Sequence, residues 1–299
     1  MSETRGNIID GKAVAKAVKD ALKPRIAALL NCGITPGLTA ILVGDDPGSE
    51  TYVRNKVLAC EKLGLASQVI KRPSTISQSE LADIIAGLNA DTKVHGILTQ
   101  SPLPQHIDAL SVTLATDPAK DVDGFHPYNL GMLLIGRPTL IPCTPYGIQV
   151  LLEHYQIPTA GKEVVVVGRS NIVGKPVAAL LMQKGMWADA TVTVAHSKST
   201  NLDNITCHAD ILIAAIGSPN FITAPMIKPG ATVIDVGINR LSDSSQAKGY
   251  RLVGDVDFDS AKAVASHITP VPGGVGPMTI AMLMQNTVTA AERQTGISR

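Results

Sequence analysis

The chain has 299 residues, a net charge of +1, 17% charged residues and 3% aromatic residues. This length allows two domains, each large enough to bury a core of its own. A nucleic-acid-binding face needs clustered basic residues and stacking rings, so the composition argues against nucleic acid as a partner. The four cysteines form no CxxC pair, which argues against a zinc site or a disulfide framework. Because residues 1–6 hold no apolar segment and no apolar run could span a bilayer, we expect a cytoplasmic protein without a membrane partner.

The first half of the chain alternates helix-like and strand-like segments. Asp10 can cap the first helix, and Ser77-Gln-Ser-Glu80 forms a capping box for the third. The predicted elements are a helix from Asp10 to Cys32, a strand from Leu38 to Val43, a helix from Ser49 to Lys62, a strand from Ala66 to Ile70, a helix from Ser77 to Asn89 and a strand from Gly96 to Gln100.

Two places in this half could carry chemistry. Tyr52 and Lys56 stand four residues apart, so they project from one face of the second helix. A solvated lysine beside a half-buried tyrosine would show the same spacing. Gln100 ends a strand, where parallel sheets bind ligands, although it could also be a capping amide.

The loop Lys120–Gly124 carries two carboxylates. It resembles part of a calcium loop but lacks the third ligand pair and the closing glutamate, so we expect no metal there. We expect Asp121 to form the turn and Asp123 to face a ligand.

The second half begins with a boundary at Pro142–Pro145, followed by a helix from Tyr146 to Tyr155. Four consecutive valines after Glu163 predict a strand that is covered on both faces, as in a parallel sheet between helices. The strand ends at Gly168, and a helix is predicted from Gly174 to Gly185. The start of such a helix presents unpaired N–H groups, which suit a phosphate. Gly168-x-Ser170-x-x-x-Gly174 is a variant of the dinucleotide fingerprint, so an ordinary strand-turn-helix remains an alternative.

The residues after the next strand, Ala190–Ala195, bear on the choice of cofactor. An enzyme that uses NAD usually has an acidic residue here for the ribose 2′-hydroxyl, whereas this chain has His196-Ser-Lys-Ser-Thr200. Hydroxyl groups and a lysine, together with Arg169, would accept a 2′-phosphate. The sequence therefore favours NADP.

The alternation continues towards the last predicted helix, Met278–Arg293, and predicts a doubly wound α/β fold. A helix starts near Asn201, and strands are predicted at Ile211–Ala215 and Thr232–Val236. Gly217 and Gly237 fall just past these strands, where they could allow close approach to a cofactor or simply form turns.

Several motifs occur together and in a fixed order. They are Tyr52-Val-Arg-Asn-Lys56, Gly96-Ile-Leu-Thr-Gln-Ser-Pro-Leu-Pro104, Lys120-Asp-Val-Asp-Gly124, Pro142-Cys-Thr-Pro145, Gly168-Arg-Ser-Asn-Ile-Val-Gly-Lys-Pro176, Ile234-Asp-Val-Gly237, Gly254-Asp-Val256 and Thr269-Pro-Val-Pro-Gly-Gly-Val-Gly-Pro-Met-Thr279. In this order they resemble the bifunctional methylenetetrahydrofolate dehydrogenase/cyclohydrolase (FolD) family over nearly the whole chain.

The resemblance implies an N-terminal α/β catalytic domain and a C-terminal Rossmann-type NADP-binding domain with a cleft between them. The folate-binding catalytic domain would comprise residues 1–145 with the last helix, 278–299, and the NADP-binding domain residues 146–277. The family oxidises 5,10-methylenetetrahydrofolate with NADP to the 5,10-methenyl cation and hydrolyses this cation to 10-formyltetrahydrofolate. It is typically a homodimer that forms through the nucleotide-binding domain.

The resemblance also implies roles for individual residues. Lys56 would be the central catalytic residue, Gln100 would hydrogen-bond it, Tyr52 would pack on the folate rings, and Asp123 would anchor the amino-pyrimidine edge of the pterin. A buried amine can accept the proton of water when desolvation lowers its pKa. Further substrate-binding residues would be Val53, Pro102, Leu103, Pro272, Gly273 and Gly276. The cofactor-binding residues would be Thr144, Gly168, Arg169, Ser170, Val173, Gly174, His196, Ser197, Ala215, Gly217, Ile238 and Thr279.

Two residues depart from the family pattern, and other functions must be weighed. Ser101 stands where the family usually has leucine, and Gly48 where alanine is common. The resemblance therefore does not determine the exact shape of the folate pocket. We expect the bifunctional form, without the synthetase domain of trifunctional relatives. The alternatives are a relative that keeps only the dehydrogenase and a non-catalytic NADP- or folate-binding protein. A short-chain dehydrogenase is excluded, because in that family the nucleotide motif precedes Tyr-x-x-x-Lys.

Overall fold

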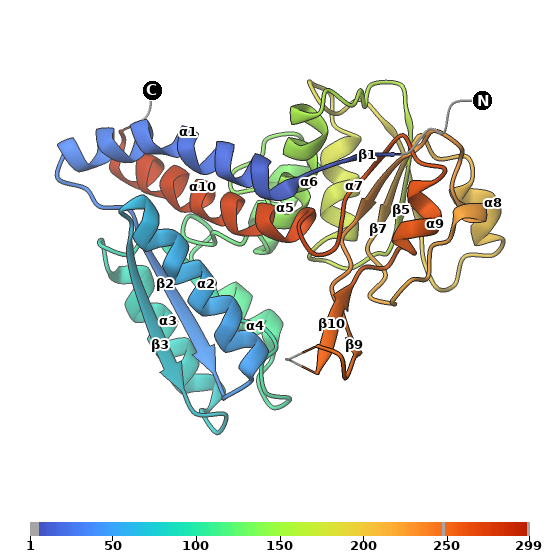
Figure 1. Cartoon of the computed structure of the whole chain (residues 1–299). Helices are drawn as coiled ribbons and strands as arrows, with labels where there is room; N and C mark the ends of the chain where they lie inside the picture. The colour runs from blue at the N-terminus through green and yellow to red at the C-terminus, as the bar shows by residue number, and fades with distance from the viewer. Residues whose placement is uncertain (1–5, 247–248, 298–299) are drawn as a thin grey trace. The chain divides into compact units, whose positions relative to one another are not determined.

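A computed structural model describes residues 6–246 and 249–297 (Figure 1). The chain divides into two compact units, each built from two segments of sequence. The six-stranded unit consists of Met1–Ala15 and Thr144–Thr279, and the three-stranded unit of Lys16–Cys143 and Ile280–Arg299.

The three-stranded unit is an α/β structure around a parallel sheet with the strand order β3-β2-β4. All seven residues of its central strand are buried, because helices cover both faces of the sheet. The predicted capping box closes the start of α3, where Ser77 and Glu80 bond each other's backbone N–H groups. The elements that lie wholly or mostly in this unit are α1 (Gly11–Asn31), β2 (Gly37–Val43), α2 (Pro47–Leu63), β3 (Ala66–Arg72), α3 (Gln78–Ala90), β4 (Gly96–Thr99), α4 (Ala109–Ala115), α5 (Pro127–Leu134) and α10 (Val275–Thr295).

Helices α1 and α10 lie side by side in the three-stranded unit, although they come from opposite ends of the chain (Figure 1). The Arg25 guanidinium, on α1, donates to both carboxylate oxygens of Glu292 on α10, at 2.9 and 2.6 Å. It also donates to the Thr289 hydroxyl at 2.8 Å. This bidentate ion pair fixes the register of the two helices.

The six-stranded unit is a parallel sheet with the strand order β1-β11-β8-β7-β5-β6. Val164–Val167 are all buried, as the run of valines predicts. The doubly wound α/β fold is confirmed, with an additional antiparallel hairpin of β9 and β10 (Figure 1). The elements of this unit are β1 (Asn7–Ile8), α6 (Cys143–His154), β5 (Glu163–Val167), α7 (Gly174–Leu181), β6 (Thr191–Ala195), α8 (Leu202–Thr206), β7 (Ile211–Ala214), η1 (Ala224–Met226), β8 (Thr232–Asp235), β9 (Asn239–Ser242), β10 (Tyr250–Val253), α9 (Phe258–Lys262) and β11 (His267–Ile268).

Helix α7 is shorter than its predicted range of 174–185. It ends at Leu181, whose carbonyl accepts the N–H of Ala190 at 3.0 Å. The N–H of Asp189 bonds to the carbonyl of Gln183 at 2.8 Å. These turn bonds fold the chain back towards β6 and replace the bonds that a longer helix would make.

Candidate active site

The Lys56 amine lies against Gln100 in the three-stranded unit. Both Tyr52 and Lys56 are on α2, whose first turn is capped by the Asp46 side chain. Lys56 Nζ donates to Gln100 Oε1 at 3.0 Å, and Lys56 is only 9% exposed. Tyr52, one turn earlier, is 43% exposed, which leaves an aromatic surface beside the amine. The pairing predicted for Lys56 and Gln100 is therefore present.

Gln100 is itself fixed at both ends. Its backbone N–H bonds to the carbonyl of Ile41 on β2 at 2.9 Å, which continues the strand pairing beyond β4. Its side-chain Nε2 donates to the carbonyl of Ser101 at 2.7 Å, so Oε1 must face Lys56. The Ser49 hydroxyl approaches the same carbonyl at 3.5 Å. Since these contacts use the backbone of Ser101, they do not depend on the side chain at this position.

The loop that carries Asp123 is anchored on both sides. Asn286, on α10, donates from Nδ2 to the carbonyls of Val122 and Ile141, both at 2.8 Å. Gly124 has a φ of +78°, and a Cβ there would overlap the backbone of Pro142. Only glycine fits this bend, and it brings Asp123 to its place.

The carboxylates of this loop have different surroundings. Asp121 Oδ2 accepts the N–H of His126 at 2.7 Å and Nδ2 of Asn129 at 2.8 Å, so it holds the start of α5, as a turn-forming residue should. For the Asp123 carboxylate no hydrogen-bond partner is found among the described residues. Burial raises the pKa of Asp123 from 3.8 to about 6, although Lys56 lowers it; Asp121 adds to the rise. A partly buried acid without a protein partner is typical of a ligand site.

Lys120, at the start of the loop, is buried and structural. Its Nζ donates to the carbonyls of Leu88 and Asp91 at 3.0 and 2.7 Å. Burial lowers the pKa of Lys120.

The remaining predicted substrate residues fall in two places. Val53 is 3% exposed on α2, and Pro102 and Leu103 follow Gln100 directly. Pro272, Gly273 and Gly276 belong to the six-stranded unit, where Gly273 has a φ of +118°.

Most of the predicted cofactor residues of the six-stranded unit follow the carboxyl ends of β5, β6 and β7. Gly168 donates its N–H to the carbonyl of Ala195 at 2.8 Å, which places Arg169 and His196 after adjacent strands. A Cβ on Gly168 would overlap the carbonyl of Ala215, and a Cβ on Gly174 would overlap that of Gly168. Both glycines are therefore required by close backbone contacts.

The turn after β6 keeps a cationic and hydroxyl-rich edge. His196 and Ser199 bond each other, from the N–H of His196 to the Ser199 hydroxyl at 3.0 Å and from the N–H of Ser199 to the His196 carbonyl at 2.8 Å. Ser197 and Lys198 are exposed, as is Arg169 after β5. This edge can receive a phosphate monoester.

The start of α7 corrects one expectation. Its N–H groups are not unpaired: those of Val173 and Gly174 bond to the Ser170 hydroxyl at 3.2 and 3.3 Å, and that of Lys175 bonds to the Ser170 carbonyl at 3.0 Å. The short side chain of Ser170 folds back over the helix start. Because its oxygen already accepts two bonds, its O–H remains to be donated to an anion.

Two further residues predicted to bind the cofactor, Thr144 and Thr279, are in contact. Their hydroxyl oxygens lie 2.9 Å apart, which joins the start of α6 to α10. Ala215, Gly217 and Ile238 lie in the loops that follow β7 and β8. Gly217 has a φ of +77°, so this turn requires glycine irrespective of any cofactor.

Three residues that shape these regions, Asn286, Asp235 and Asp255, were not predicted from the sequence. Asp235 and Asp255 belong to the motifs Ile234-Asp-Val-Gly237 and Gly254-Asp-Val256, but the sequence did not indicate a role for either carboxylate. Asn286 had no signal beyond its place on the last helix.

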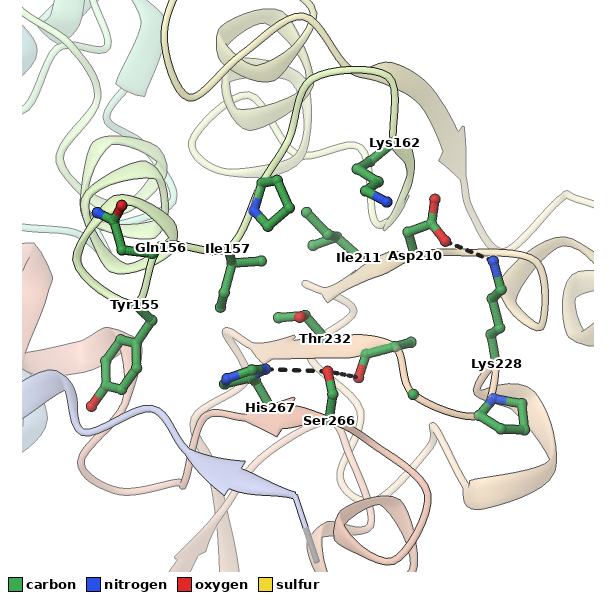
Figure 2. A pocket seen from close by; sticks show the side chains of 14 residues that line it. Tyr155, Gln156, Ile157, Lys162, Asp210, Ile211, Lys228, Thr232, Ser266 and His267 are labelled. Carbon is green, nitrogen blue, oxygen red and sulfur yellow. Dashed lines mark hydrogen bonds and ion pairs between the residues drawn. The ribbon is translucent and has the colours of Figure 1, made fainter. Parts of the chain in front are cut away.

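The six-stranded unit contains a cavity of about 340 Å³, whose lining side chains are drawn in Figure 2. It opens at the amino ends of β7, β8 and β11, whereas those residues follow the carboxyl ends of strands. Lys228 and Asp210, which line it, form an ion pair at 2.6 Å. None of the predicted site residues lines this cavity.

Residues 6–246 and 249–297, which the structure describes, contain neither a metal-ligating cluster nor a membrane-spanning helix. There, no three or more His, Cys, Asp or Glu side chains are grouped so that they could hold a metal ion. Within the same residues, every helix is too short or too polar to cross a membrane.

Comparison with known proteins identifies the family. The model of the tetrahydrofolate dehydrogenase/cyclohydrolase catalytic domain matches residues 9–123, and that of the NAD(P)-binding domain of the same name matches residues 142–295. A protein of Chlorobium chlorochromatii (strain CaD3) named Bifunctional protein FolD is 56% identical over 293 residues, which are 97% of this chain and 99% of that protein.

Solved structures agree with these matches. The bifunctional FolD enzyme of Campylobacter jejuni is 46% identical with a TM-score of 0.91, over 96% of this chain and 99% of that one. The Trypanosoma brucei methylenetetrahydrofolate dehydrogenase-cyclohydrolase, solved with NADP cofactor and inhibitor, is 41% identical with a TM-score of 0.92, over 97% and 98% of the two chains. The family predicted from the ordered motifs is thereby confirmed: this chain belongs to the tetrahydrofolate dehydrogenase/cyclohydrolase family.

Proposed function

We propose that this chain oxidises 5,10-methylenetetrahydrofolate to 5,10-methenyltetrahydrofolate with NADP+ and hydrolyses the product to 10-formyltetrahydrofolate, with Lys56 at the centre of the site. The observation that carries this proposal is the bond from Lys56 Nζ to Gln100 Oε1 at 3.0 Å, on a lysine that is only 9% exposed. The uncharged Gln100 side chain thus fixes the orientation of the Lys56 amine.

In the first reaction, a hydride leaves the methylene carbon for NADP+. The lone pair of the neighbouring folate nitrogen stabilises the cation that forms, so this step needs orientation more than a strong base. Tyr52 offers an exposed ring on which the folate rings can pack. The Asp123 carboxylate can accept hydrogen bonds from the amino-pyrimidine edge, since it has no partner among the described residues.

In the second reaction, water adds to the methenyl carbon and must lose a proton. In its neutral form the Lys56 amine can take this proton, while Gln100 keeps its nitrogen in place. The bond from the former methenyl carbon to folate N5 then breaks, and N5 takes up a proton, which leaves the formyl group on N10. Because Gln100 is held by Ser101 and Ile41, the pair is organised before substrate binds.

The proposed NADP site uses the loops after β5, β6, β7 and β8. Arg169, Ser197 and Lys198 are exposed, and among the described residues neither Arg169 nor Lys198 has an ion pair with a carboxylate, which supports a preference for the 2′-phosphate. The Ser170 hydroxyl can donate to another phosphate oxygen. We expect kcat/KM to be at least about tenfold higher with NADP than with NAD, since charge-assisted bonds to phosphate are lost with NAD. Comparable values with the two cofactors would contradict the preference.

The domain roles and the assembly are also proposals. We propose that the folate-binding domain comprises residues 1–145 with 278–299 and that residues 146–277 bind NADP. The compact units differ from this division at the start of the chain, because Met1–Ala15 belongs to the six-stranded unit. We propose a homodimer through the nucleotide-binding domain and a cytoplasmic location. Sedimentation of the purified protein would test the dimer, and a monomer at micromolar concentration would contradict it.

A paired assay tests the catalytic assignment. We would measure NADPH formation from methylenetetrahydrofolate and loss of methenyltetrahydrofolate absorbance for wild type, Lys56→Met and Lys62→Met. Lys62 is exposed in the last turn of the same helix, so it is the matched control. We expect Lys56→Met to lose at least about 10²-fold in hydrolysis and Lys62→Met to keep both activities.

The outcomes separate the alternatives. Wild-type rates in Lys56→Met would contradict the assignment of Lys56. Oxidation without hydrolysis in wild type would identify a dehydrogenase-only relative. Neither activity in wild type would favour a non-catalytic NADP- or folate-binding protein.

A further inference from the structure

A buried carboxylate organises the loop after β7. Asp255 is 0% exposed, and its Oδ2 accepts the backbone N–H groups of Ile216 and Gly217 at 2.6 and 2.9 Å. Its Oδ1 accepts the N–H of Ser218 at 3.0 Å and Nδ2 of Asn239 at 2.9 Å. Three successive backbone N–H groups thus converge on one carboxylate, as they do around anions in proteins.

A second buried carboxylate organises the loop after β8. Asp235 is 3% exposed, and its Oδ1 accepts the N–H groups of Gly237 and Asp255, both at 2.9 Å. Its Oδ2 accepts the N–H of Val256 at 3.0 Å. Asp235 therefore positions the backbone of Asp255, and Asp255 positions the loop after β7.

The glycines of the two motifs make room for these carboxylates. A Cβ on Gly237 would overlap the Asp255 carboxylate, and a Cβ on Gly254 would overlap that of Asp235. Gly237 was predicted either to allow close approach of a cofactor or to form a turn. The structure shows that its close neighbour is the Asp255 carboxylate of the same chain. The motifs Ile234-Asp-Val-Gly237 and Gly254-Asp-Val256 together encode one structure.

The loops that this pair holds carry three of the proposed cofactor residues, Ala215, Gly217 and Ile238. We infer that Asp255 is a positioning residue for NADP, which holds the loops after β7 and β8 in the shape that receives the cofactor. The inference rests on the proposed NADP site.

The charge of Asp255 also restricts which part of the cofactor these loops can meet. The N–H groups of residues 216–218 are already bonded to a carboxylate, so they cannot bind a phosphate. A phosphate there would also be repelled by Asp255. These loops therefore face a part of NADP without phosphate, and the phosphates are left to Arg169, Ser170 and the turn after β6.

The experiment uses the fact that hydrolysis of methenyltetrahydrofolate needs no NADP. Asp255→Asn keeps the shape of the side chain but replaces one carboxylate oxygen with an NH2 group. This group is a donor, so the two N–H groups that the oxygen accepted lose their hydrogen bonds. We expect kcat/KM for NADP to fall at least about tenfold and NADPH binding to weaken similarly, while hydrolysis stays within about twofold of wild type. Asp259→Asn, which changes an exposed carboxylate of α9, is the control and should leave all three unchanged.

A milder variant covers the case in which Asp255→Asn does not fold. Asn239→Ala removes one of the four donors to Asp255 and should raise KM for NADP about threefold, with hydrolysis unchanged. Unchanged NADPH binding in both folded variants would overturn the inference. A parallel fall of hydrolysis and NADP use would also overturn it, because it would show a role in stability alone. If wild type did not reduce NADP, the proposed function would fail instead, a result distinct from either.

Discussion

The two units differ in the hydrogen bonds that they provide to a buried carboxylate. In the three-stranded unit, the Asp123 carboxylate is partly buried and has no hydrogen-bond partner among the described residues, and its pKa rises to about 6. In the six-stranded unit, Asp255 is fully buried and accepts four hydrogen bonds from the protein. Burial of a carboxylate therefore does not by itself mark a ligand site; the absence of protein donors does.

The largest expected effect comes from filling the space beside Asp235, the buried carboxylate that holds the backbone of Asp255. Gly254→Ala would place a methyl group on the Asp235 carboxylate, so we expect the free energy of unfolding to fall by about 3 kcal/mol or more. Chemical denaturation measures this. The control is Gly87→Ala on α3, where a Cβ meets nothing within 4 Å and a small gain in stability is expected. A Gly254→Ala protein as stable as wild type would show that the Asp235 network is loose.

The same substitution in the two regions should change stability in opposite directions. Asp123→Asn removes a poorly solvated charge, so we expect the free energy of unfolding at pH 7 to rise by roughly 1–3 kcal/mol, while both activities fall at least about tenfold. Asp255→Asn leaves N–H donors unpaired and should lower it by about 2 kcal/mol. Thermal denaturation of both variants tests the contrast, and two shifts of the same sign would remove it.

The dependence of stability on pH sharpens the comparison. Burial raises the pKa of Asp123 to about 6 and that of Asp235 to about 7, from 3.8 in both cases. Between about pH 4 and pH 7 the folded chain therefore binds more protons than the unfolded chain, so these two groups make stability fall as pH rises. We expect a shallower fall in Asp123→Asn than in wild type when the melting temperature is followed across this range. Identical slopes would contradict the raised pKa of Asp123.

Substrate binding should depend on the same acid. As pH falls through about 6, Asp123 takes up a proton and its carboxylate is lost as an acceptor. We expect KM for the folate substrate to rise severalfold from pH 7 to pH 5, whereas KM for NADP should not follow this titration. Steady-state kinetics at fixed ionic strength measure both constants. A folate KM that is constant over this range would argue against contact with Asp123.

The smallest effect concerns a hydroxyl group next to Gln100. Among the described residues, Thr99 Oγ1 is the buried side-chain oxygen for which no partner is found. Thr99→Val removes this unpaired group at nearly constant volume and should raise the free energy of unfolding by about 1 kcal/mol. Thr92→Val, in an exposed turn, is the control. A loss of substrate affinity in Thr99→Val would instead make this hydroxyl a ligand contact.

The sequence predicted the fold class and the local elements, but not several of the contacts between distant segments. The valine run of β5, the capping box of α3 and the helix with Lys56 depend on neighbours along the chain, so their patterns were readable. The pairing of β1 with β11, the β9–β10 hairpin and the hold of Asn286 on Val122 join segments that show no mutual pattern. The prediction that the N–H groups at the start of α7 are unpaired was wrong, because the Ser170 hydroxyl accepts two of them.

The discontinuity of both units has a consequence for protein synthesis. The six-stranded unit needs Met1–Ala15 as well as Thr144–Thr279, and the three-stranded unit is incomplete without Ile280–Arg299. In the order of synthesis, the six-stranded unit is complete at Thr279, whereas the unit that holds Lys56 still lacks Ile280–Arg299 at that point. Asn286, which holds the carbonyls of Val122 and Ile141, belongs to this later segment. We therefore expect the loop that carries Asp123 to gain this anchor after the whole six-stranded unit has been synthesised.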